Sequence, residues 1–320
     1  MLVHDQSHTG RLAGAGAKGI AQSRVHLPPM RGPLRARKQT VAGSGAPPHA
    51  ARPIGLKMKA NQIPVALTIA GSDSGGGAGI QADLKTFAAL GVHGTSVLTC
   101  ITAQNPRKVL GVETCSSGIL RKQLAAVFAE LAPAAVKTGM LLNRENIRVI
   151  VGFLKKAKPR SPLVVDPVMV STSGVRLLAK DAVAELQASL LPLATLTTPN
   201  LDEATILTGH KISSLEQMRA AARELHDRFG CAVLVKGGHL KGSREAADIF
   251  FDGKNELLLS APFIKGITTH GTGCTYSAAI CAALAGGHDL PEAVTIGKTY
   301  ITAAIRNSYR VGQHFVLGAG

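Results

Sequence analysis

The sequence predicts an α/β fold with a mostly parallel central sheet covered by helices on both faces, and three observations lead to this prediction. Short apolar runs recur along the chain, segments of helical period separate them, and glycine or proline stands where many runs end. Hydrophobic residues make up 45% of the 320 residues and charged residues 18%, which is sufficient for a large buried interior. Repeated strand–helix units with right-handed crossovers make neighbouring strands parallel.

The first half of the predicted core alternates strands and helices. Val65–Ala70 is an apolar run ended by glycines, and Ile80–Leu90 follows it with apolar residues at helical spacing. Strand Leu163–Val165 ends at Asp166-Pro167, where proline forces the preceding residue out of helical geometry. Between them the same patterns predict strands at 96–101 and 135–137 and helices at 119–131 and 145–156.

The second half continues the alternation and ends with a hairpin and two helices. Leu215–Phe229 has apolar residues on one helical face, and Ala232–Val235 is an all-apolar strand. Asp252-Gly253 is a hairpin signal, so the strands on either side of it are expected to be antiparallel. The remaining predicted elements are helices at 182–191, 202–207, 272–285 and 290–306, and strands at 196–197, 248–251 and 256–259.

Residues 1–57 are predicted to be a disordered basic arm ahead of one folded domain, 58–320. The arm contains six of the 16 prolines, shows no sustained period, and has nine basic residues against one acid, so it carries half of the net charge of +16. Gly14–Gly19 matches GxGxxG, but without the strand and helix that a dinucleotide site requires. The arm is either a targeting peptide or sequence upstream of the true start, and the sequence after Met58 favours the second.

Composition excludes several classes of protein. No apolar run is long enough to span a bilayer, so no membrane partner is expected. The five cysteines form no CxxC pair and no zinc spacing, which predicts a reducing, cytoplasmic setting. The chain has no Trp and three Tyr, so it offers few stacking platforms to nucleic acid. Gly297–Thr299 ends like a P-loop, but Glu292 replaces the leading glycine, which excludes a P-loop kinase.

Polar and glycine-rich loops directly follow the predicted strands. In parallel sheets, ligands bind beyond the carboxyl ends of the strands, so these loops predict one binding crevice along a single rim. They are Gly71–Gly79, Thr102–Asn105, Gly139-Met140, Asp166–Met169, Pro199–Glu203, Lys236–His239 and His270–Cys274.

The last of these loops carries the most chemistry. Gly271, Thr272 and Gly273 lie at the start of a predicted helix, so their backbone N–H groups and the helix dipole can form an anion hole for a transferred phosphoryl group. The alternative is an ordinary helix start capped by Thr272. Cys274 lies in the first helical turn, which is expected to lower its thiol pKa and suits a general base. Cys281 is expected to fill the core.

The ordered motifs GSDSGGGAGIQADLKTF, TAQN, KTGM, DPVM, TPNLDEA, VKGGH and HGTGC resemble those of the hydroxymethylpyrimidine (phosphate) kinase family, from about Ala66 to Ile305. The resemblance implies a ribokinase-like three-layer α/β/α fold, commonly homodimeric. It also implies Mg²⁺- and ATP-dependent phosphorylation of 4-amino-5-hydroxymethyl-2-methylpyrimidine and then of its monophosphate, in thiamin biosynthesis. The chain departs from the family at Asp73-Ser74-Gly75, where relatives carry Asp-Pro-Ser, and only loosely resembles the family's C-terminal ending.

The resemblance also implies roles for individual residues on the substrate side. Cys274 is implied as the catalytic base, where most of the wider superfamily carries Asp. Gln104 is implied as the reader of the aminopyrimidine, since one amide both donates and accepts; the alternative is a strand-end cap of backbone groups. Asp83 is expected to reach back over the glycine-rich loop toward the substrate. The alternative is a negative charge in the first turn of the helix, where the helix dipole favours it. Gly71, Ala78, Met140, Val168 and Met169 match positions that line the family's cleft, although core packing explains them equally well.

A second group is implied to manage metal and phosphates. Glu203 and Asp166 are the expected metal residues, because carboxylates suit Mg²⁺. Lys236, Asn200 and Thr272 are expected to contact ATP. Asn200 would serve as a helix cap and Lys236 as a solvated lysine under the alternative interpretations.

Three rival functions remain from the sequence. Pyridoxal or pyridoxine kinase is the rival within the family. A non-catalytic pyrimidine-binding protein would use the same scaffold, but the intact HGTGC loop argues against it. Nucleic-acid binding through the basic arm predicts an affinity that disappears when residues 1–57 are removed.

Overall fold

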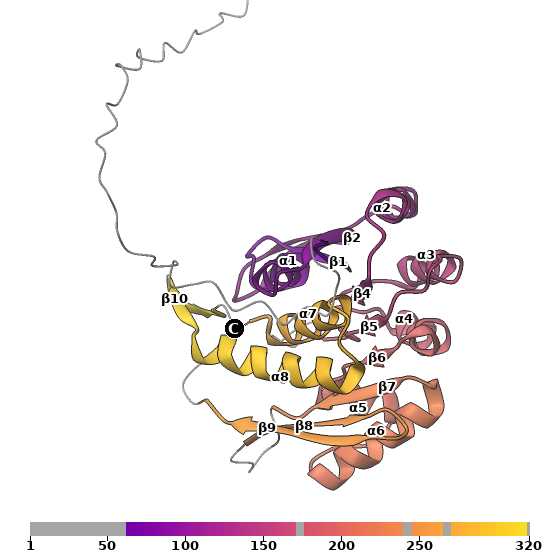
Figure 1. Ribbon diagram of the computed structural model, residues 1–320. Helices are drawn as coiled ribbons and strands as arrows, with labels where there is room; N and C mark the ends of the chain where they lie inside the picture. Colours follow the sequence, from indigo (N-terminus) through magenta and orange to yellow (C-terminus); the bar gives the residue numbers. More distant parts are fainter. Residues whose placement is uncertain (1–61, 171–175, 239, 241–244, 265–269, 319–320) are drawn as a thin grey trace, which may run out of the picture. The chain divides into compact units, whose positions relative to one another are not determined.

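The computed structural model describes residues 62–170, 176–238, 240, 245–264 and 270–318. In this part of the chain, nine strands form one sheet in the order β3-β2-β1-β4-β5-β6-β7-β8-β9 (Figure 1). The six strands from β2 to β7 in this order run parallel. At one edge β3 is antiparallel to β2, and at the other edge β8 is antiparallel to β7 and β9 is antiparallel to β8. The predicted arm and both interpretations of it, together with His239, Thr268 and Thr269, lie outside the described residues.

The element bounds follow the predicted alternation. The strands are β1 Val65–Asp73, β2 His93–Gln104, β3 Val109–Thr114, β4 Ala135–Thr138, β5 Leu163–Val165, β6 Leu196–Thr197, β7 Ala232–Lys236, β8 Glu245–Phe251, β9 Glu256–Pro262, β10 Tyr309–Val311 and β11 His314–Val316. The α-helices are α1 Gly79–Ala89, α2 Ser117–Glu130, α3 Arg144–Leu154, α4 Lys180–Glu185, α5 Leu201–Thr208, α6 Leu215–Phe229, α7 Thr272–Ala285 and α8 Leu290–Arg306.

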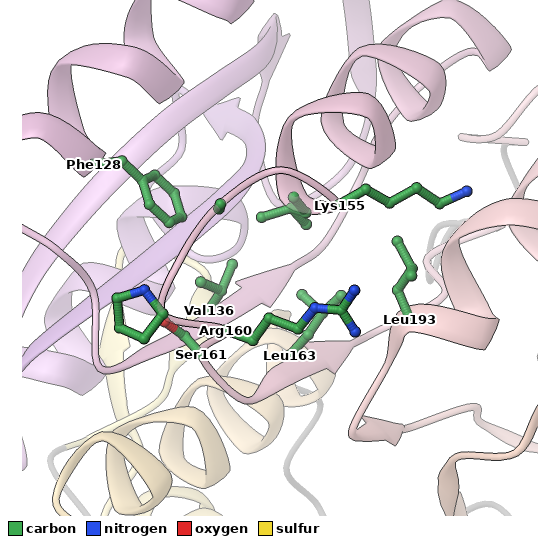
Figure 2. A pocket seen from close by; sticks show the side chains of 10 residues that line it. Phe128, Val136, Lys155, Arg160, Ser161, Leu163 and Leu193 are labelled. Atoms are coloured by element: carbon green, nitrogen blue, oxygen red, sulfur yellow. The ribbon is translucent and has the colours of Figure 1, made fainter.

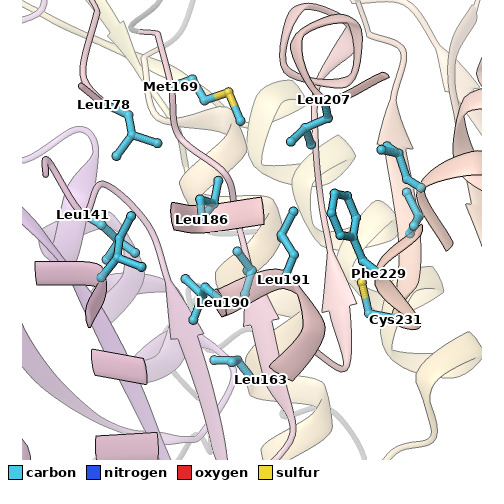
Figure 3. Packing of buried hydrophobic residues seen from close by; sticks show 14 of the residues in the cluster. Leu141, Leu163, Met169, Leu178, Leu186, Leu190, Leu191, Leu207, Phe229 and Cys231 are labelled. Carbon is cyan, nitrogen blue, oxygen red and sulfur yellow. The ribbon is translucent and has the colours of Figure 1, made fainter. Parts of the chain in front are cut away.

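Helices cover both faces of the sheet, as predicted. One buried apolar cluster joins the sheet to α2, α3, α4, α5 and α6, and Figure 3 shows part of it around Met169, Leu186 and Phe229. The second cluster joins the other face to α1, α7 and α8, and it is rich in alanine from α7. Small side chains on α7 let this helix lie close to the sheet, which brings its first turn to the rim where the parallel strands end.

The differences from prediction lie at the edges. β3 was not expected, because nearly all of it is exposed and it therefore lacks a buried apolar run. The predicted helix at 182–191 is instead α4, a π-helical segment Leu186–Leu190 and a 3₁₀ turn Leu191–Leu193. The predicted hairpin is confirmed by the antiparallel pairing of β8 and β9. No helix among the described residues has the length and apolar character needed to cross a membrane.

Candidate active site

The first and last predicted loops, Gly71–Gly79 and His270–Cys274, touch at their backbones. Gly271 has a φ of +86°, and a Cβ there would lie 1.8 Å from the Gly77 carbonyl oxygen. Gly79 has a φ of +57°, and its Cβ would lie 2.4 Å from the Gly71 carbonyl oxygen. Only glycine fits both the backbone conformation and the space at these two positions. The fold therefore joins loops that lie almost 200 residues apart along the chain.

Helix α7 begins at Thr272 with Gly271 as its N-cap, and no side chain caps it. The alternative in which Thr272 caps the helix is therefore wrong. The N–H groups of the first turn lack a side-chain acceptor at the positive end of the helix dipole, which is an arrangement that suits an anion. The geometry of residues 271–273 fits an anion hole, and that role stays a prediction.

Cys274 is partly buried in this first turn. Burial raises the pKa of its thiol to about 11, although the Lys137 ammonium and an N–H···S bond from Gly79 oppose the shift. The expected lowering of the pKa by the helix terminus is therefore wrong, because desolvation outweighs it. At pH 7 the thiol carries its proton, and a thiolate formed there would be a strong base.

Lys137 on β4 and Asp83 on α1 form a fully enclosed ion pair, which we call the sealed pair. The Lys137 ammonium lies 2.8 Å from each Asp83 carboxylate oxygen, and both side chains are 0% exposed. Thr68 also donates to Asp83 Oδ2 at 2.6 Å. Burial alone would lower the pKa of Lys137, but Asp83, together with Cys274 and Asp166, outweighs burial and raises that pKa. Asp83 is thus held beneath the site and does not reach over the glycine-rich loop as expected.

Lys236 at the end of β7 and Asp166 after β5 form a second pair, which we call the rim pair. Lys236 Nζ donates to Asp166 Oδ1 at 2.9 Å, and Thr198 Oγ1 donates to the same oxygen at 3.0 Å. A Cβ at Gly273 would lie 3.4 Å from Lys236 Nζ, so the pair lies directly beneath the start of α7. Burial would raise the pKa of Asp166, but Lys236 and then Lys137 outweigh it, and that pKa is lowered.

Asn200 and Glu203 close the start of α5 with a capping box. Asn200 Oδ1 accepts the Glu203 N–H and Glu203 Oε2 accepts the Asn200 N–H, both at 2.9 Å. The capping interpretation of Asn200 is therefore confirmed. Burial raises the pKa of Glu203 to about 7; Lys236 opposes this shift and Asp166 adds to it.

Asp166 and Glu203 are the carboxylates that would meet Mg²⁺ at this site. Among the described residues, no three His, Cys, Asp or Glu side chains group closely enough to hold a metal. Magnesium commonly keeps several waters and takes one or two carboxylates together with substrate phosphates. Asp166 and Glu203 supply two such carboxylates, and they lie close enough together for Asp166 to raise the pKa of Glu203.

Gln104 contacts a residue that the sequence did not single out. Its Nε2 lies 2.8 Å from His270 Nε2, and its Oε1 lies 3.3 Å from Thr102 Oγ1. The Gln104 amide therefore bonds side chains instead of capping backbone groups. Asp73 lies next to this contact and accepts N–H groups from Gly75, Gly77 and Ala78.

The remaining predicted residues lie close by. A Cβ at Gly71 would meet Cys100 Sγ at 2.7 Å and Met140 Sδ at 3.6 Å, so Gly71 and Met140 are neighbours. Val168 is half-buried after β5, and its N–H bonds the Asp166 carbonyl. Met169 belongs to the core cluster. The sequence analysis missed roles for Lys137, Asp73, His270 and Ser277, although a lysine inside the buried strand AVKT was a usable signal.

A small cavity of about 50 Å³ lies at the amino ends of β4 and β5 (Figure 2). It is lined by Phe128, Val136, Leu163 and Leu193, with Lys155 and Arg160 also contributing. None of the predicted site residues lines it. It is therefore distinct from the crevice, because the predicted loops follow the opposite, carboxyl ends of the strands.

Comparisons with known proteins agree with this arrangement. The family model described as phosphomethylpyrimidine kinase matches residues 73–318. A hydroxymethylpyrimidine/phosphomethylpyrimidine kinase of Rhizobium meliloti (strain 1021) is 55% identical over 252 residues, which are 78% of this chain and 94% of that protein. The crystal structure of phosphomethylpyrimidine kinase from Clostridium difficile 630 gives a TM-score of 0.67 at 46% identity, covering 76% of this chain and 99% of that one. An ADP complex of Bacillus subtilis pyridoxal kinase gives 0.75 at 38% identity, covering 81% and 98%.

Proposed function

The chain belongs to the phosphomethylpyrimidine kinase family, and we propose that it transfers a phosphoryl group from ATP to 4-amino-5-hydroxymethyl-2-methylpyrimidine and then to the resulting monophosphate, in thiamin biosynthesis. It is a ribokinase-like kinase, as its fold and relatives indicate. The observation that carries the proposal is Cys274 at the uncapped start of α7, beside the rim pair. Cys274 as the base, the N–H groups of the first turn as the anion site and Lys236 as the phosphate contact would then act at one place.

The proposed chemistry assigns a step to each group. Cys274 first releases its proton to solvent, and its thiolate then takes the proton of the substrate hydroxyl as that oxygen attacks the γ-phosphorus. The bond between the γ-phosphorus and the β–γ bridging oxygen breaks, and ADP leaves with that electron pair. Backbone N–H groups of residues 271–273 bind the negative charge on the transferring group, and Lys236 attracts the phosphates. Mg²⁺, held by Glu203 and Asp166 through water and phosphates, would neutralise phosphate charge when bound.

The raised pKa of Cys274 shapes this mechanism. A thiol with a pKa of about 11 is protonated in the free enzyme at pH 7. Lys137 is the cation whose field acts on this sulfur, and the raised pKa already includes its effect, so the thiolate is a minor form of the free enzyme at pH 7. Once formed, a strongly basic thiolate matches the weak acidity of an alcohol better than a carboxylate does.

Exchange of Cys274 for Ala tests the proposal directly. We expect Cys274→Ala to lower kcat on the aminopyrimidine alcohol by about 10²- to 10⁴-fold, which is the usual contribution of a general base. Cys281→Ala is the matched control, because Cys281 lies on the same helix but is fully buried in the core. Full kcat in Cys274→Ala would contradict the assignment of the base. Binding of the pyrimidine without ADP release by the native chain would instead support a non-catalytic binding protein.

Pyridoxal phosphorylation is the second candidate function. It is favoured by the likeness to solved pyridoxal kinases, one of them at a TM-score of 0.75. Side-by-side coupled assays on pyridoxal and on the aminopyrimidine alcohol separate the two functions, since faster turnover of pyridoxal would overturn the primary proposal.

We also propose that the chain works as a homodimer in a reducing, cytoplasmic setting. All five cysteines are free, which is consistent with that setting. Ile101, Leu110 and Val112 on β2 and β3 expose apolar side chains that a second copy would cover. Sedimentation equilibrium is expected to give twice the chain mass, and Leu110→Lys is expected to return it to the monomer mass.

A further inference from the structure

His270 Nε2 lies between two groups with opposite requirements. The Gln104 Nε2 group, which only donates, is 2.8 Å away, whereas an Asp73 carboxylate oxygen, which only accepts, is 3.4 Å away. One ring nitrogen either carries a proton or offers a lone pair, so it satisfies one of these neighbours at a time. The state of this nitrogen and the orientation of the Gln104 amide are therefore linked.

Asp73 has three backbone partners besides the imidazole. Its carboxylate already accepts backbone N–H groups from Gly75, Gly77 and Ala78, at 2.8 to 3.1 Å. Gln104 Nε2 has His270 as its partner at the shorter distance. The arrangement thus favours His270 Nε2 as the acceptor of a Gln104 N–H. A proton on that nitrogen would point toward Asp73 and would oblige the amide to turn its oxygen toward the ring.

Thr102, the other neighbour of the Gln104 amide, does little to fix the orientation of that amide. Thr102 Oγ1 has one proton and two acceptors within reach, the Ser72 carbonyl oxygen at 2.8 Å and Gln104 Oε1 at 3.3 Å. The shorter contact takes the proton in the simplest assignment. His270 is therefore the contact that decides how the amide is turned.

His270 is itself held in place by the glycine-rich loop. A Cβ at Gly77 would lie 3.3 Å from His270 Cδ2, so the ring packs against the bare backbone of that residue. The side chain is 23% exposed, which leaves the contact at the edge of the crevice. With one N–H given to His270, the amide still offers its second N–H and its oxygen to a ligand.

We propose that His270 is a positioning residue that fixes the orientation of the Gln104 carboxamide and thereby determines the preference for an aminopyrimidine over a pyridine substrate. The inference rests on the proposed function. A ring nitrogen beside an exocyclic amine needs a donor and an acceptor in fixed order, and a turned amide reverses that order. A pyridine alcohol lacks this pair of groups and loses less when the amide turns.

The test is a double-mutant cycle measured with both substrates. His270→Leu is expected to raise the KM for the aminopyrimidine alcohol about tenfold, as loss of an oriented hydrogen bond allows. Its kcat, and its KM for pyridoxal, are expected to change less than about threefold. In a Gln104→Leu background the same exchange is expected to have no further effect on KM, because the residue acts through that amide. His270→Gln, which keeps an acceptor on a side chain of similar reach, is expected to restore most of the preference.

His226→Leu is the control, since His226 lies on α6 and bonds the Cys231 carbonyl outside the crevice. The inference is overturned if His270→Leu lowers kcat equally on both substrates, or if it acts undiminished in the Gln104→Leu background. Isothermal titration calorimetry with the aminopyrimidine alcohol measures the same double-mutant cycle as differences in binding affinity. A native enzyme that turns over only pyridoxal would contradict the proposed function, while the binding cycle would still decide the role of His270.

Discussion

Two lysine–aspartate pairs lie near the start of α7, and they differ in how completely the fold encloses them. In the sealed pair, Lys137 and Asp83 are both 0% exposed, and both carboxylate oxygens bond the same ammonium. In the rim pair, Lys236 is 13% exposed and Asp166 is 3% exposed, and the ammonium donates to Asp166 Oδ1. The same two residue types therefore form one fully enclosed pair and one partly exposed pair.

The difference in exposure determines what each pair can do. The sealed pair is fully enclosed, so a ligand cannot reach it, and its charges act on neighbouring groups only through their electric field. The field of Lys137 does reach Cys274 and opposes the rise of its pKa. The rim pair, by contrast, leaves the Lys236 side chain 13% exposed, at the place where phosphates are proposed to bind. We infer a supporting role for the sealed pair and a direct role for the rim pair.

The largest expected difference concerns stability. Lys137→Met leaves the Asp83 carboxylate buried without its partner, so the free energy of unfolding is expected to fall by about 3–5 kcal/mol. Urea denaturation measures it. The double variant Lys137→Met with Asp83→Leu removes both charges and is expected to recover most of the loss. A single variant as stable as the native chain would show that the sealed pair is not a structural element.

The next difference concerns catalysis. Lys236→Met removes the cation proposed to contact phosphates, so kcat/KM is expected to fall about 10²-fold. Its free energy of unfolding is expected to fall less than that of Lys137→Met, because Asp166 keeps Thr198 and Ser277 as partners. Steady-state rates and urea denaturation on the same preparation compare the two lysines. Equal losses of stability would remove the distinction between the pairs.

A third prediction uses Cys274, which both pairs influence. Alkylation requires the thiolate, and the thiol pKa is about 11, so the rate is expected to rise about tenfold per pH unit from pH 7 to 10. Lys137→Met is expected to slow alkylation at each pH, because loss of the nearby positive charge raises the pKa further. Iodoacetamide labelling with peptide mass spectrometry follows this site apart from Cys115. A rate independent of pH in this range would mean that Cys274 is already ionised.

The smallest effect is expected at Ser277. Its hydroxyl lies 3.2 Å from Asp166 Oδ2 and 2.9 Å from the Gly273 carbonyl oxygen, so it ties the rim pair to α7. Ser277→Ala is expected to cost about 1 kcal/mol in urea denaturation, since Asp166 retains stronger partners. Ser189→Ala, in the π-helical segment Leu186–Leu190, is the control for loss of a serine hydrogen bond to a carboxylate, because Ser189 donates to Glu185.

The order of elements could be predicted because its signals are local. Apolar runs such as Ala232–Val235 and the helical period of Leu215–Phe229 are properties of neighbouring residues, and β7 and α6 match them closely. The motif order that led to the family was likewise readable in one dimension. β3 escaped prediction because an exposed edge strand leaves no apolar run to detect.

The sequence by itself determined the α/β alternation, the rim on which the loops gather, and the choice of Cys274 and Gln104 as candidate residues. Only the tertiary structure decided that Asp83 faces Lys137, 54 residues away, and that Gln104 faces His270, 166 residues away. It also reversed the expected direction of the Cys274 pKa. The physical reason is the same in each case. Desolvation and charge pairing depend on which distant residues the packed fold encloses together, whereas periodicity and turn chemistry depend only on neighbours along the chain.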